Sequence, residues 1–368
     1  MFLRGGFMRE EGKKRKTWQV ILFGLAVFLV LGLLVTELYW NNMLNLMGDA
    51  EETVPTLSPE EIEALLGPTE ETVPTETTVP EETWPAVKSD KNITNIMLVG
   101  QNFREDEQNK LSDTMILCSI NRKTKTMTMV SFLRDLYVPL PAYAGHGPGR
   151  NRINVCYALG STWTRSSKGG MEMLALCIEQ NFGIHVDHTI EVGFEAFTGI
   201  IDGFGGVDIE VTEAEAKYMT DHIGYIGDIK PGYQTLDGME ALAYARIRKI
   251  DGDRQRAARQ RAVITALIEK IRDIDLKDMY NAAEYCLPFV ITDMTNQEVT
   301  NYILELLPML KDMKLHSLTC PADNETLPHS MWGKSIDLYG YQSYVIECNT
   351  ALNGRYLRYA LGIPDEKE

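Results

Sequence analysis

The sequence predicts an α/β fold, in which helices cover both faces of a sheet, carried by one membrane-spanning helix near the N-terminus. Two observations lead to this prediction. An uncharged apolar run precedes an acidic, proline-containing stretch, and beyond residue 90 short strand-like segments alternate with helical ones. Residues 91–368 are long enough to form one large domain with a substantial core.

The first 40 residues have the charge pattern of a membrane anchor. Residues 1–16 contain six lysines and arginines, and residues 17–36 carry no charge. About twenty helical residues cross the ~30 Å core of a bilayer, and positive charge before the span places the N-terminus in the cytoplasm. We therefore expect a cytoplasmic tail at 1–16, a transmembrane helix at 17–40 and an extracellular C-terminal domain, in a single-pass protein of the cell membrane. A cleaved signal peptide is the alternative, but Glu37-Leu38-Tyr39-Trp40 is a poor cleavage site.

Residues 41–90 are predicted to be a disordered linker rich in acidic residues, proline and threonine. From Asp49 to Asp90 the chain has twelve acidic residues and one lysine, and Glu-Glu-Thr-Val-Pro-Thr occurs at both 51–56 and 70–75. This composition cannot bury enough apolar surface to offset chain entropy. The segment therefore reads as a spacer between the membrane and the domain at 91–368.

The domain at 91–368 shows alternating patterns and no internal linker. We expect strands at residues 93–100, 114–120, 126–133, 188–192, 207–211 and around 314–319. We expect helices at residues 154–159, 171–181, 194–201, 236–244, 255–274 and 296–307, and a last helical stretch near the C-terminus.

Common catalytic signatures are absent from the sequence, which has no Gly-x-Ser-x-Gly, His-Glu-x-x-His or Cys-x-x-Cys motif. The six cysteines permit disulfides in an oxidising compartment, but their spacing does not give the pairing. Cys118 lies in an apolar strand-like run and is expected to be a buried small hydrophobic residue.

The most unusual stretch of this acidic chain is 246–261, which holds six arginines and one lysine although the net charge is -16. On a helix that begins near Asp253, Arg256, Arg259 and Gln260 share a face, whereas Arg246 and Arg248 share one only if their piece is extended. Guanidinium groups match phosphate oxygens. The stretch therefore predicts a phosphate clamp, with a solvated basic helix face as the alternative.

Further arginines follow predicted strands or precede helices. Arg104 comes after the first strand, Arg134 closes the third, and Arg152 leads into a helix. Ligands of open α/β sheets bind where loops gather beyond strand ends. We therefore expect these arginines to join the clamp in one anion site.

Ordered motifs across residues 93–270 resemble the LytR–CpsA–Psr family of cell-wall assembly proteins. They include Ser112-Asp113-Thr114-Met115, Ser131-Phe132-Leu133-Arg134-Asp135, Arg152-Ile153-Asn154, Gly205-Gly206-Val207-Asp208 and Ala243-Tyr244-Ala245-Arg246-Ile247-Arg248. The resemblance implies an α/β/α sandwich with a central mixed sheet. It also implies a phosphotransferase that uses Mg²⁺ to move a glycopolymer phosphate from a polyprenyl-pyrophosphate carrier in the membrane to peptidoglycan.

The resemblance also implies roles for individual residues. Arg134, Asp135, Asp253 and Arg256 would be catalytic, with the two aspartates orienting arginines or acting as acid–base groups. Metal ligands would be Asp113 and Asn102, although the family usually has Asp where this chain has Asn102. The pyrophosphate would be held by Arg104, Arg152, Arg246, Arg248, Arg256, Arg259 and Gln260.

An apolar channel for the polyprenyl tail is a further implication. Its candidate walls are Phe194, Phe197, Ile200, Ile201, Phe204 and the helix at 171–178, with ordinary core packing as the alternative.

Three other functions fit some of these features. The same pocket would serve a lipid-pyrophosphate pyrophosphatase, or a non-catalytic polyprenyl-phosphate-binding scaffold, which Asn102 favours. A DNA-binding regulator would use the arginines on phosphates, but the expected topology places them outside the cell. The charge of -8 over residues 91–368 also repels nucleic acid, so we expect no nucleic-acid partner.

Overall fold

The computed structural model describes residues 40, 43–45, 47–49, 87, 89–101, 111–224, 226–273, 290–322, 327, 330–338 and 341–363. It divides the chain into two units, Met1–Leu46 and Met47–Glu368. The predicted tail, nearly all of the predicted transmembrane helix and most of the linker lie outside the described residues. Within the described part, none of the helices is both long and apolar enough to cross a membrane.

The second unit is built on a mixed sheet of seven strands in the order β1-β10-β7-β2-β3-β4-β11. β2 pairs antiparallel with β3 and parallel with β7, and β4 pairs antiparallel with β3 and parallel with β11. These strands are β1 (Gly48–Asp49), β2 (Ile93–Gln101), β3 (Ser112–Asn121), β4 (Thr126–Phe132), β7 (His188–Val192), β10 (Val290–Thr292) and β11 (Lys314–Cys320). The predicted α/β fold with a central mixed sheet is confirmed.

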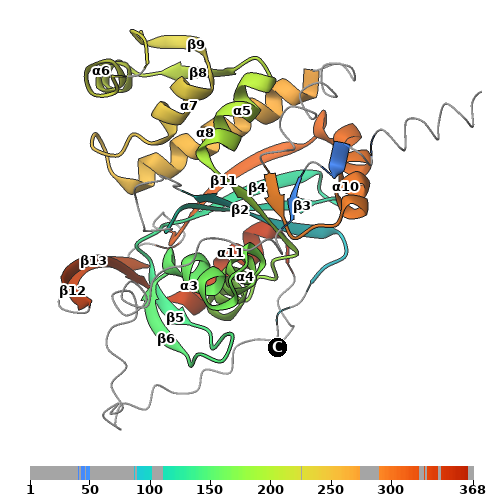
Figure 1. The fold of residues 1–368 in the computed structure, drawn as a ribbon, viewed down its shortest axis with the longest axis vertical. Coiled ribbons are helices and arrows are strands. Elements are labelled where there is room, and N and C mark those ends of the chain that lie inside the picture. The colour runs from blue at the N-terminus through green and yellow to red at the C-terminus, as the bar shows by residue number, and fades with distance from the viewer. Residues whose placement is uncertain are drawn as a thin grey trace, which may run out of the picture. The chain divides into compact units, whose positions relative to one another are not determined.

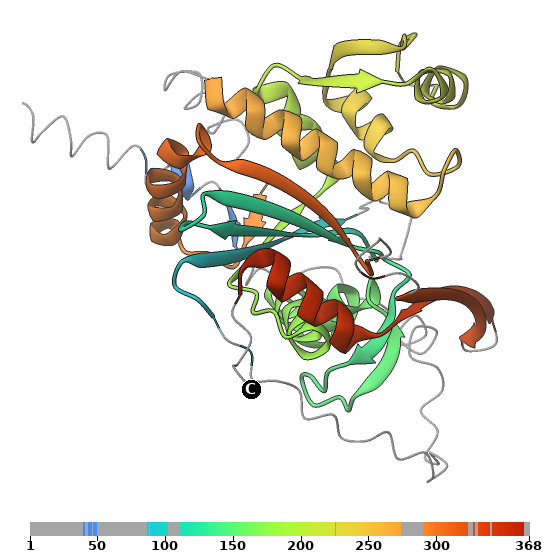
Figure 2. The ribbon, with the colours of Figure 1, turned by 180° about the vertical axis from the view of Figure 1, so that it is seen from behind.

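Helices lie on both faces of this sheet (Figures 1 and 2). On one side lie α5 (Phe194–Gly203), α6 (Glu213–His222), α7 (Gly238–Ala245) and α8 (Asp253–Asp273). On the other side lie α3 (Val155–Thr164), α4 (Ser167–Phe182) and α11 (Thr350–Leu361). α10 (Asn296–Leu310) packs on the same face as α8, where its Leu306, Met309 and Leu310 cluster with Ile268 of α8 and with Ile96, Ile120 and Met127 of the sheet.

The central strand β3 shows why the sequence requires cover on both faces. Met115 and Leu117 are buried in the core shared with α3, α4 and α11, whereas Ile116 and Cys118 pack in a separate cluster against Ile264 of α8. Alternating side chains point to opposite faces of a strand, so a strand apolar on both faces needs two layers of helices. Cys118 is buried as expected, burial raises the pKa of its thiol to about 12, and the described cysteines are free thiols.

A close contact between α5 and α7 fixes the part of the chain that carries Arg246. A Cβ atom added at Gly238 would lie 2.4 Å from the main-chain oxygen of Thr198, so only glycine allows this approach. Asp237 and Glu240 form a capping box that starts α7 at this point. α7 then ends at Ala245, which leaves Arg246 beside the first residue of α5, Phe194.

In the described part of the chain, three two-stranded ribbons surround the main sheet, and of their strands only β8 (Val207–Val211) was expected. Their strands pair as β5 with β6, β8 with β9, and β12 with β13. The unexpected strands are β5 (Tyr137–Leu140), β6 (Gly149–Arg152), β9 (Gly232–Leu236), β12 (Met331–Leu338) and β13 (Tyr341–Cys348). The β12–β13 ribbon is held at the sheet edge by a hydrogen bond of 2.8 Å from the Ile346 main-chain N–H to the main-chain oxygen of Asp135.

Candidate functional site

The candidate site lies at one edge of the sheet, where several chain segments meet. The register pairs Gly100 near the end of β2 with Thr114 near the start of β3 and with Val192 at the end of β7. β4 ends at the same edge, because Ser131 pairs with Ile116. The predicted gathering of polar residues beyond strand ends is therefore present in the fold.

Asp253, the first residue of α8, binds three arginines. Its Oδ1 lies 2.9 Å from Nε of Arg248 and 3.2 Å from Nη2 of Arg256, and its Oδ2 lies 3.6 Å from Nε of Arg134. A carboxylate is favourable at a helix N-terminus, where the unpaired N–H groups carry partial positive charge. Asp253 therefore fixes the arginines relative to the start of α8.

Asp135 is a second buried carboxylate in the same network. Its oxygens lie 3.4 Å from Nη1 of Arg152, 3.7 Å from Nε of Arg134 and 4.0 Å from Nη2 of Arg248. Burial is the main cause that raises the pKa of Asp135, and the neighbouring Asp253 raises it further against the opposing effect of the arginines. A carboxyl group that holds its proton more tightly than usual is suited to proton transfer.

Asp113, near the start of β3, completes the network. Its Oδ1 lies 2.6 Å from Nη1 of Arg134, and its main-chain oxygen accepts a hydrogen bond of 3.4 Å from Nη2 of Arg256. We call this network the arginine cluster. Its members are four arginines and three aspartates: Arg134, Arg152, Arg248, Arg256, Asp113, Asp135 and Asp253.

The arginine cluster has an excess of positive charge, because it sets four guanidinium groups against three carboxylates. Burial lowers the pKa of Arg256, and the neighbouring Arg134 and Arg248 lower it further, although Asp253 opposes them. The charge of Arg256 is thus incompletely compensated by the protein. An anion placed against the cluster would relieve this cost.

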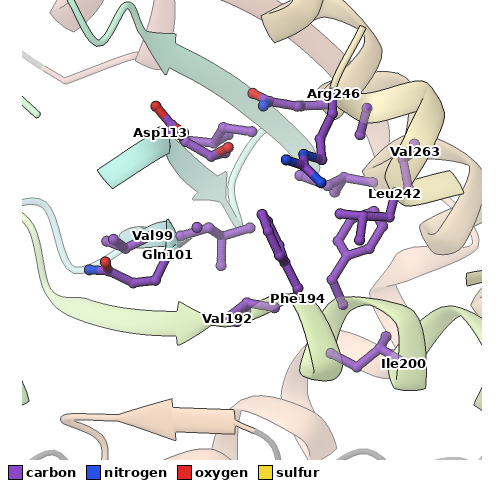
Figure 3. Close-up of a pocket in the computed structure, with 18 of the residues that line it drawn as sticks. Val99, Gln101, Asp113, Val192, Phe194, Ile200, Leu242, Arg246 and Val263 are labelled. Carbon is purple, nitrogen blue, oxygen red and sulfur yellow. The ribbon is translucent and has the colours of Figure 1, made fainter. Parts of the chain in front are cut away.

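A cavity of about 480 Å³ extends from the arginine cluster between the sheet and α5, α7 and α8 (Figure 3). Its polar end is lined by Asp113, Arg246, Arg248, Arg256 and Gln260. Figure 3 shows Arg246 pointing into the cavity above Phe194, and its Cζ lies 4.7 Å from the centre of that ring. Arg246 and Arg248 line the same cavity, as expected, but Arg246 keeps a helical backbone at the end of α7, so the expectation of an extended piece was wrong at this residue.

The remainder of the cavity is apolar. Phe194, Phe197, Ile200 and Ile201 of α5 line it as expected, opposite Val263, Ile264 and Leu267 of α8. Phe204 is not among the lining residues, and the expectation for the helix at 171–178 was wrong. That segment belongs to α4, on the other side of the sheet, where Met171, Met173 and Leu174 are buried in the main core. Ordinary core packing explains it.

Gln101 lines the cavity and was missed as a site residue. It is 1% exposed, and among the residues that the structure describes neither its amide oxygen nor its amide nitrogen has a hydrogen-bond partner. An unpaired buried polar group costs about 1–3 kcal/mol, so a ligand that bonds to this amide would remove an existing penalty. The available signal was a polar residue at the end of the apolar run Ile96-Met97-Leu98-Val99.

Arg259 was predicted to bind the pyrophosphate, but the structure places it away from the cavity. Its Nε lies 2.6 Å from Glu215 of α6, Nη1 donates to the main-chain oxygen of Ile247 at 3.1 Å, and Nη2 pairs with Asp251. Only Arg256 and Gln260 of the predicted face line the cavity. A helix turns by about 100° per residue, so a cavity centred between positions 256 and 260 leaves position 259 on the flank.

The metal prediction concerns Asp113 and Asn102. The Asp113 side chain is 39% exposed and lines the cavity, whereas Asn102 lies outside the described residues, as does Arg104. Among the residues that the structure describes, no three His, Cys, Asp or Glu side chains form a group able to hold a metal ion. The oxygens near the polar end that suit Mg²⁺ are the carboxylate of Asp113 and the unpaired amide oxygen of Gln101.

The sequence matches the LytR_cpsA_psr family over residues 66–346. Similar proteins include the polyisoprenyl-teichoic acid–peptidoglycan teichoic acid transferase TagU of Oceanobacillus iheyensis, 37% identical over 183 residues that make up 49% of this chain and 52% of that protein. The transferase of the same description named TagT, from Bacillus subtilis, is 31% identical over 197 residues, or 52% of this chain and 56% of that protein. The chain thus spans about half the length of these relatives.

Solved structures resemble the fold over most of the domain. TagT bound to LIIa-WTA matches with a TM-score of 0.55 and 25% identity, over 74% of this chain and 92% of that chain. TagT with bound octaprenyl pyrophosphate lipid matches with a TM-score of 0.53 and 23% identity, over 75% and 93% of the two chains, which is a likeness of fold alone.

Proposed function

Because the chain belongs to the LytR_cpsA_psr family, we propose that it is a phosphotransferase that moves a glycopolymer phosphate from a polyprenyl-pyrophosphate carrier onto peptidoglycan. The observation that carries the proposal is a single cavity with an apolar body and an arginine-lined end. Relatives at 37% and 31% identity are named polyisoprenyl-teichoic acid–peptidoglycan teichoic acid transferases, which supports the same carrier and acceptor classes for this chain.

The two parts of the cavity suit the two parts of such a carrier. The walls contributed by α5 and α8 offer apolar side chains to an isoprenoid tail. The pyrophosphate would lie at the polar end, where Arg246, Arg248 and Arg256 supply charge and Gln101 and Gln260 supply amide hydrogen-bond donors.

The proposed reaction transfers the phosphorus that bears the glycopolymer. The oxygen of an acceptor hydroxyl forms a bond to this phosphorus, the bridging P–O bond of the pyrophosphate breaks, and polyprenyl phosphate leaves with the electron pair. Charge grows on the leaving phosphate, and arginines already held in place by Asp113, Asp135 and Asp253 stabilise it without reorganising. The acceptor proton would pass to Asp253 or Asp135.

Magnesium is part of the same proposal. Asp113 and the amide oxygen of Gln101 would hold it together with phosphate oxygens of the substrate. When bound, the ion would neutralise part of the pyrophosphate charge. Asn102 would add a neutral oxygen where the family usually has a carboxylate.

We further propose that residues 17–40 anchor the protein in the cell membrane, with residues 1–16 in the cytoplasm and residues 91–368 outside. The uncharged run and the positive residues before it support this topology. An extracellular domain would meet both the lipid carrier and peptidoglycan.

Transfer assays with the full chain in detergent micelles separate the proposal from its rivals. The donor is a polyprenyl pyrophosphate that carries a labelled oligosaccharide, and the acceptor is soluble, uncross-linked peptidoglycan. Label that becomes attached to peptidoglycan supports the transferase. Label released to water as a phosphosaccharide, at a rate independent of acceptor, identifies a pyrophosphatase. Saturable donor binding without any turnover identifies a scaffold. Either of the last two results overturns the transferase.

A further inference from the structure

A second cavity, of about 470 Å³, adjoins the arginine cluster. Arg248 lines both this cavity and the first one, and Asp253 lines the second. The two side chains are joined by the 2.9 Å contact between Nε of Arg248 and Oδ1 of Asp253. A group held in the second cavity therefore lies next to the reacting end of the first.

The wall of the second cavity opposite α8 is one face of the β12–β13 ribbon. In the ribbon, Ser335 pairs with Tyr344 and Gly333 pairs with Ile346. Because side chains alternate between the two faces of a strand, Ser335, Tyr344 and Ile346 lie on the same face as Met331 and Cys348. Met331, Tyr344 and Ile346 from this face line the cavity.

The ribbon is tied to the arginine cluster by short contacts. The main-chain N–H of Ile346 donates to the main-chain oxygen of Asp135 at 2.8 Å. From the other side, Nη2 of Arg254 donates to the main-chain oxygen of Pro321 at 3.1 Å and lies 2.8 Å from Sδ of Met331. The ribbon is therefore held beside the start of α8 by its contacts with Asp135 and Arg254.

Tyr344 presents an aromatic ring to this cavity. It is 55% exposed, and a Cβ atom added at Gly333 would lie 2.1 Å from its hydroxyl oxygen, so the ring lies across the glycine. An exposed ring with an apolar face and a polar hydroxyl suits a sugar, whose C–H groups form an apolar face and whose edge is polar. Trp332 is comparably exposed at 50% but belongs to the opposite face, where its Nε1 donates to Glu347 at 2.8 Å.

The charges of the second cavity favour an acidic ligand. Arg248, Lys249 and Arg254 line it together with Asp253, so three cations face one carboxylate. Lys249 is exposed, and Arg248 has 48% of its side chain exposed. The two groups can therefore meet a ligand that arrives from solvent.

We propose that this second cavity is the acceptor subsite of the transferase, and that it binds an acidic glycan strand with a sugar ring against Tyr344 and its carboxylates near Lys249. This inference rests on the proposed function. It places the acceptor hydroxyl beside Asp253, which takes the proton as the oxygen bonds to the phosphorus. Donor and acceptor thus approach the arginine cluster from two cavities that share Arg248.

The test measures initial transfer rates with the full chain at saturating donor, while the concentration of soluble peptidoglycan strands is varied. Tyr344→Ala is expected to raise the acceptor KM about tenfold, the size of a lost aromatic contact, with little change in kcat. Tyr344→Trp should restore most of the affinity. Gly333→Ala should raise KM as well, because the added methyl group displaces the ring. Trp332→Ala, on the opposite face, is the matched control and should leave KM unchanged.

Binding of a polyprenyl pyrophosphate without attached sugar is measured in parallel, by calorimetric titration of each variant. An unchanged Kd for this lipid in Tyr344→Ala, together with the raised acceptor KM, supports the subsite. Normal lipid binding with an unchanged acceptor KM in Tyr344→Ala overturns the subsite and leaves the proposed function standing. Failure of the wild type to bind the lipid overturns the proposed function itself.

Discussion

Arg256 and Arg259 lie three residues apart on α8, and replacing each by methionine should have opposite effects. The Arg256 guanidinium belongs to the arginine cluster and lines the first cavity, which we call the donor cavity, whereas that of Arg259 joins α8 to Glu215 and Asp251. Methionine keeps most of the side-chain volume and removes the charge. We expect Arg256→Met to lose ligand affinity and keep stability, and Arg259→Met to lose stability and keep affinity.

The contacts set the size of each effect on stability. Asp253 keeps Arg248 at 2.9 Å and Arg134 at 3.6 Å when Arg256 is removed, so no buried carboxylate is left alone. The pKa of Arg256 is lowered by burial, which means that its charge is held at a cost, and its removal should change the free energy of unfolding by less than about 1 kcal/mol. Arg259→Met leaves Glu215 buried without its cation, which costs about 3–5 kcal/mol.

The effect on binding follows from the lost phosphate contacts. A guanidinium that donates two hydrogen bonds to a pyrophosphate contributes about 3 kcal/mol. Its loss raises the Kd of a polyprenyl pyrophosphate about 100-fold.

Thermal unfolding and lipid titration of the same two variants test whether Arg256 serves ligand binding and Arg259 serves stability. Arg256→Met should shift Tm by a few degrees at most, and Arg259→Met should lower it by roughly 5–15 °C. The reasoning fails if Arg259→Met weakens lipid binding at an unchanged Tm. It also fails if Arg256→Met unfolds at a much lower temperature and binds lipid normally.

Three further predictions concern other parts of the molecule. The raised pKa of Asp135 contributes stability that is present below the ordinary value of 3.8 and is lost as pH rises through the raised value. Asp135→Asn should therefore gain Tm relative to wild type as pH rises above 3.8, while transfer activity falls; a Tm difference that is independent of pH contradicts this. Asn102→Asp should tighten Mg²⁺ binding and Asp113→Asn should weaken it, as measured by titration with and without a polyprenyl pyrophosphate; equal affinities in both variants would place the metal elsewhere. Gly238→Ala should lower the free energy of unfolding by about 1–3 kcal/mol through its clash with α5, whereas Gly227→Ala, which meets nothing within 4 Å, should have little effect; similar losses in denaturant titrations would refute the packing argument.

The regular elements were predictable where a local pattern and the tertiary environment agree. The strands at 188–192 and 207–211 were predicted with the bounds that the structure gives them, because polar and apolar residues alternate in these segments and glycines lie next to them. The β12–β13 ribbon was not predicted. Its first strand, β12, contains Gly333 and Lys334. The ribbon is held together by the pairing of β12 with β13, and Ile346 of β13 is hydrogen-bonded to the main chain of Asp135, which lies far away in sequence. Local propensity does not contain that information.

The candidate site was predictable in its residue types and only partly in its geometry. The sequence identified the arginines and the strand ends at which Arg134, Arg152, Arg248 and Arg256 meet. The sequence did not distinguish the role of Arg256 from that of Arg259, because helical spacing places both residues on one broad face. It does not show that the neighbouring helix α6 brings Glu215 to Arg259. The neutral Gln101 was also missed, since sequence alone does not show that its buried amide lacks a hydrogen-bond partner within the described part of the chain.

One side of α8 lines the donor cavity with Arg256, Gln260, Val263, Ile264 and Leu267. From Arg256 to Leu267 the helix rises about 16 Å, at 1.5 Å per residue. This is roughly half of the ~30 Å hydrocarbon core of a bilayer. Under the proposed function, a polyprenyl chain longer than this would extend beyond the cavity, and its far end would stay among the lipids during transfer. The enzyme would then take hold of the phosphate end of a carrier that never leaves the membrane, and release of the spent carrier would need no extraction step.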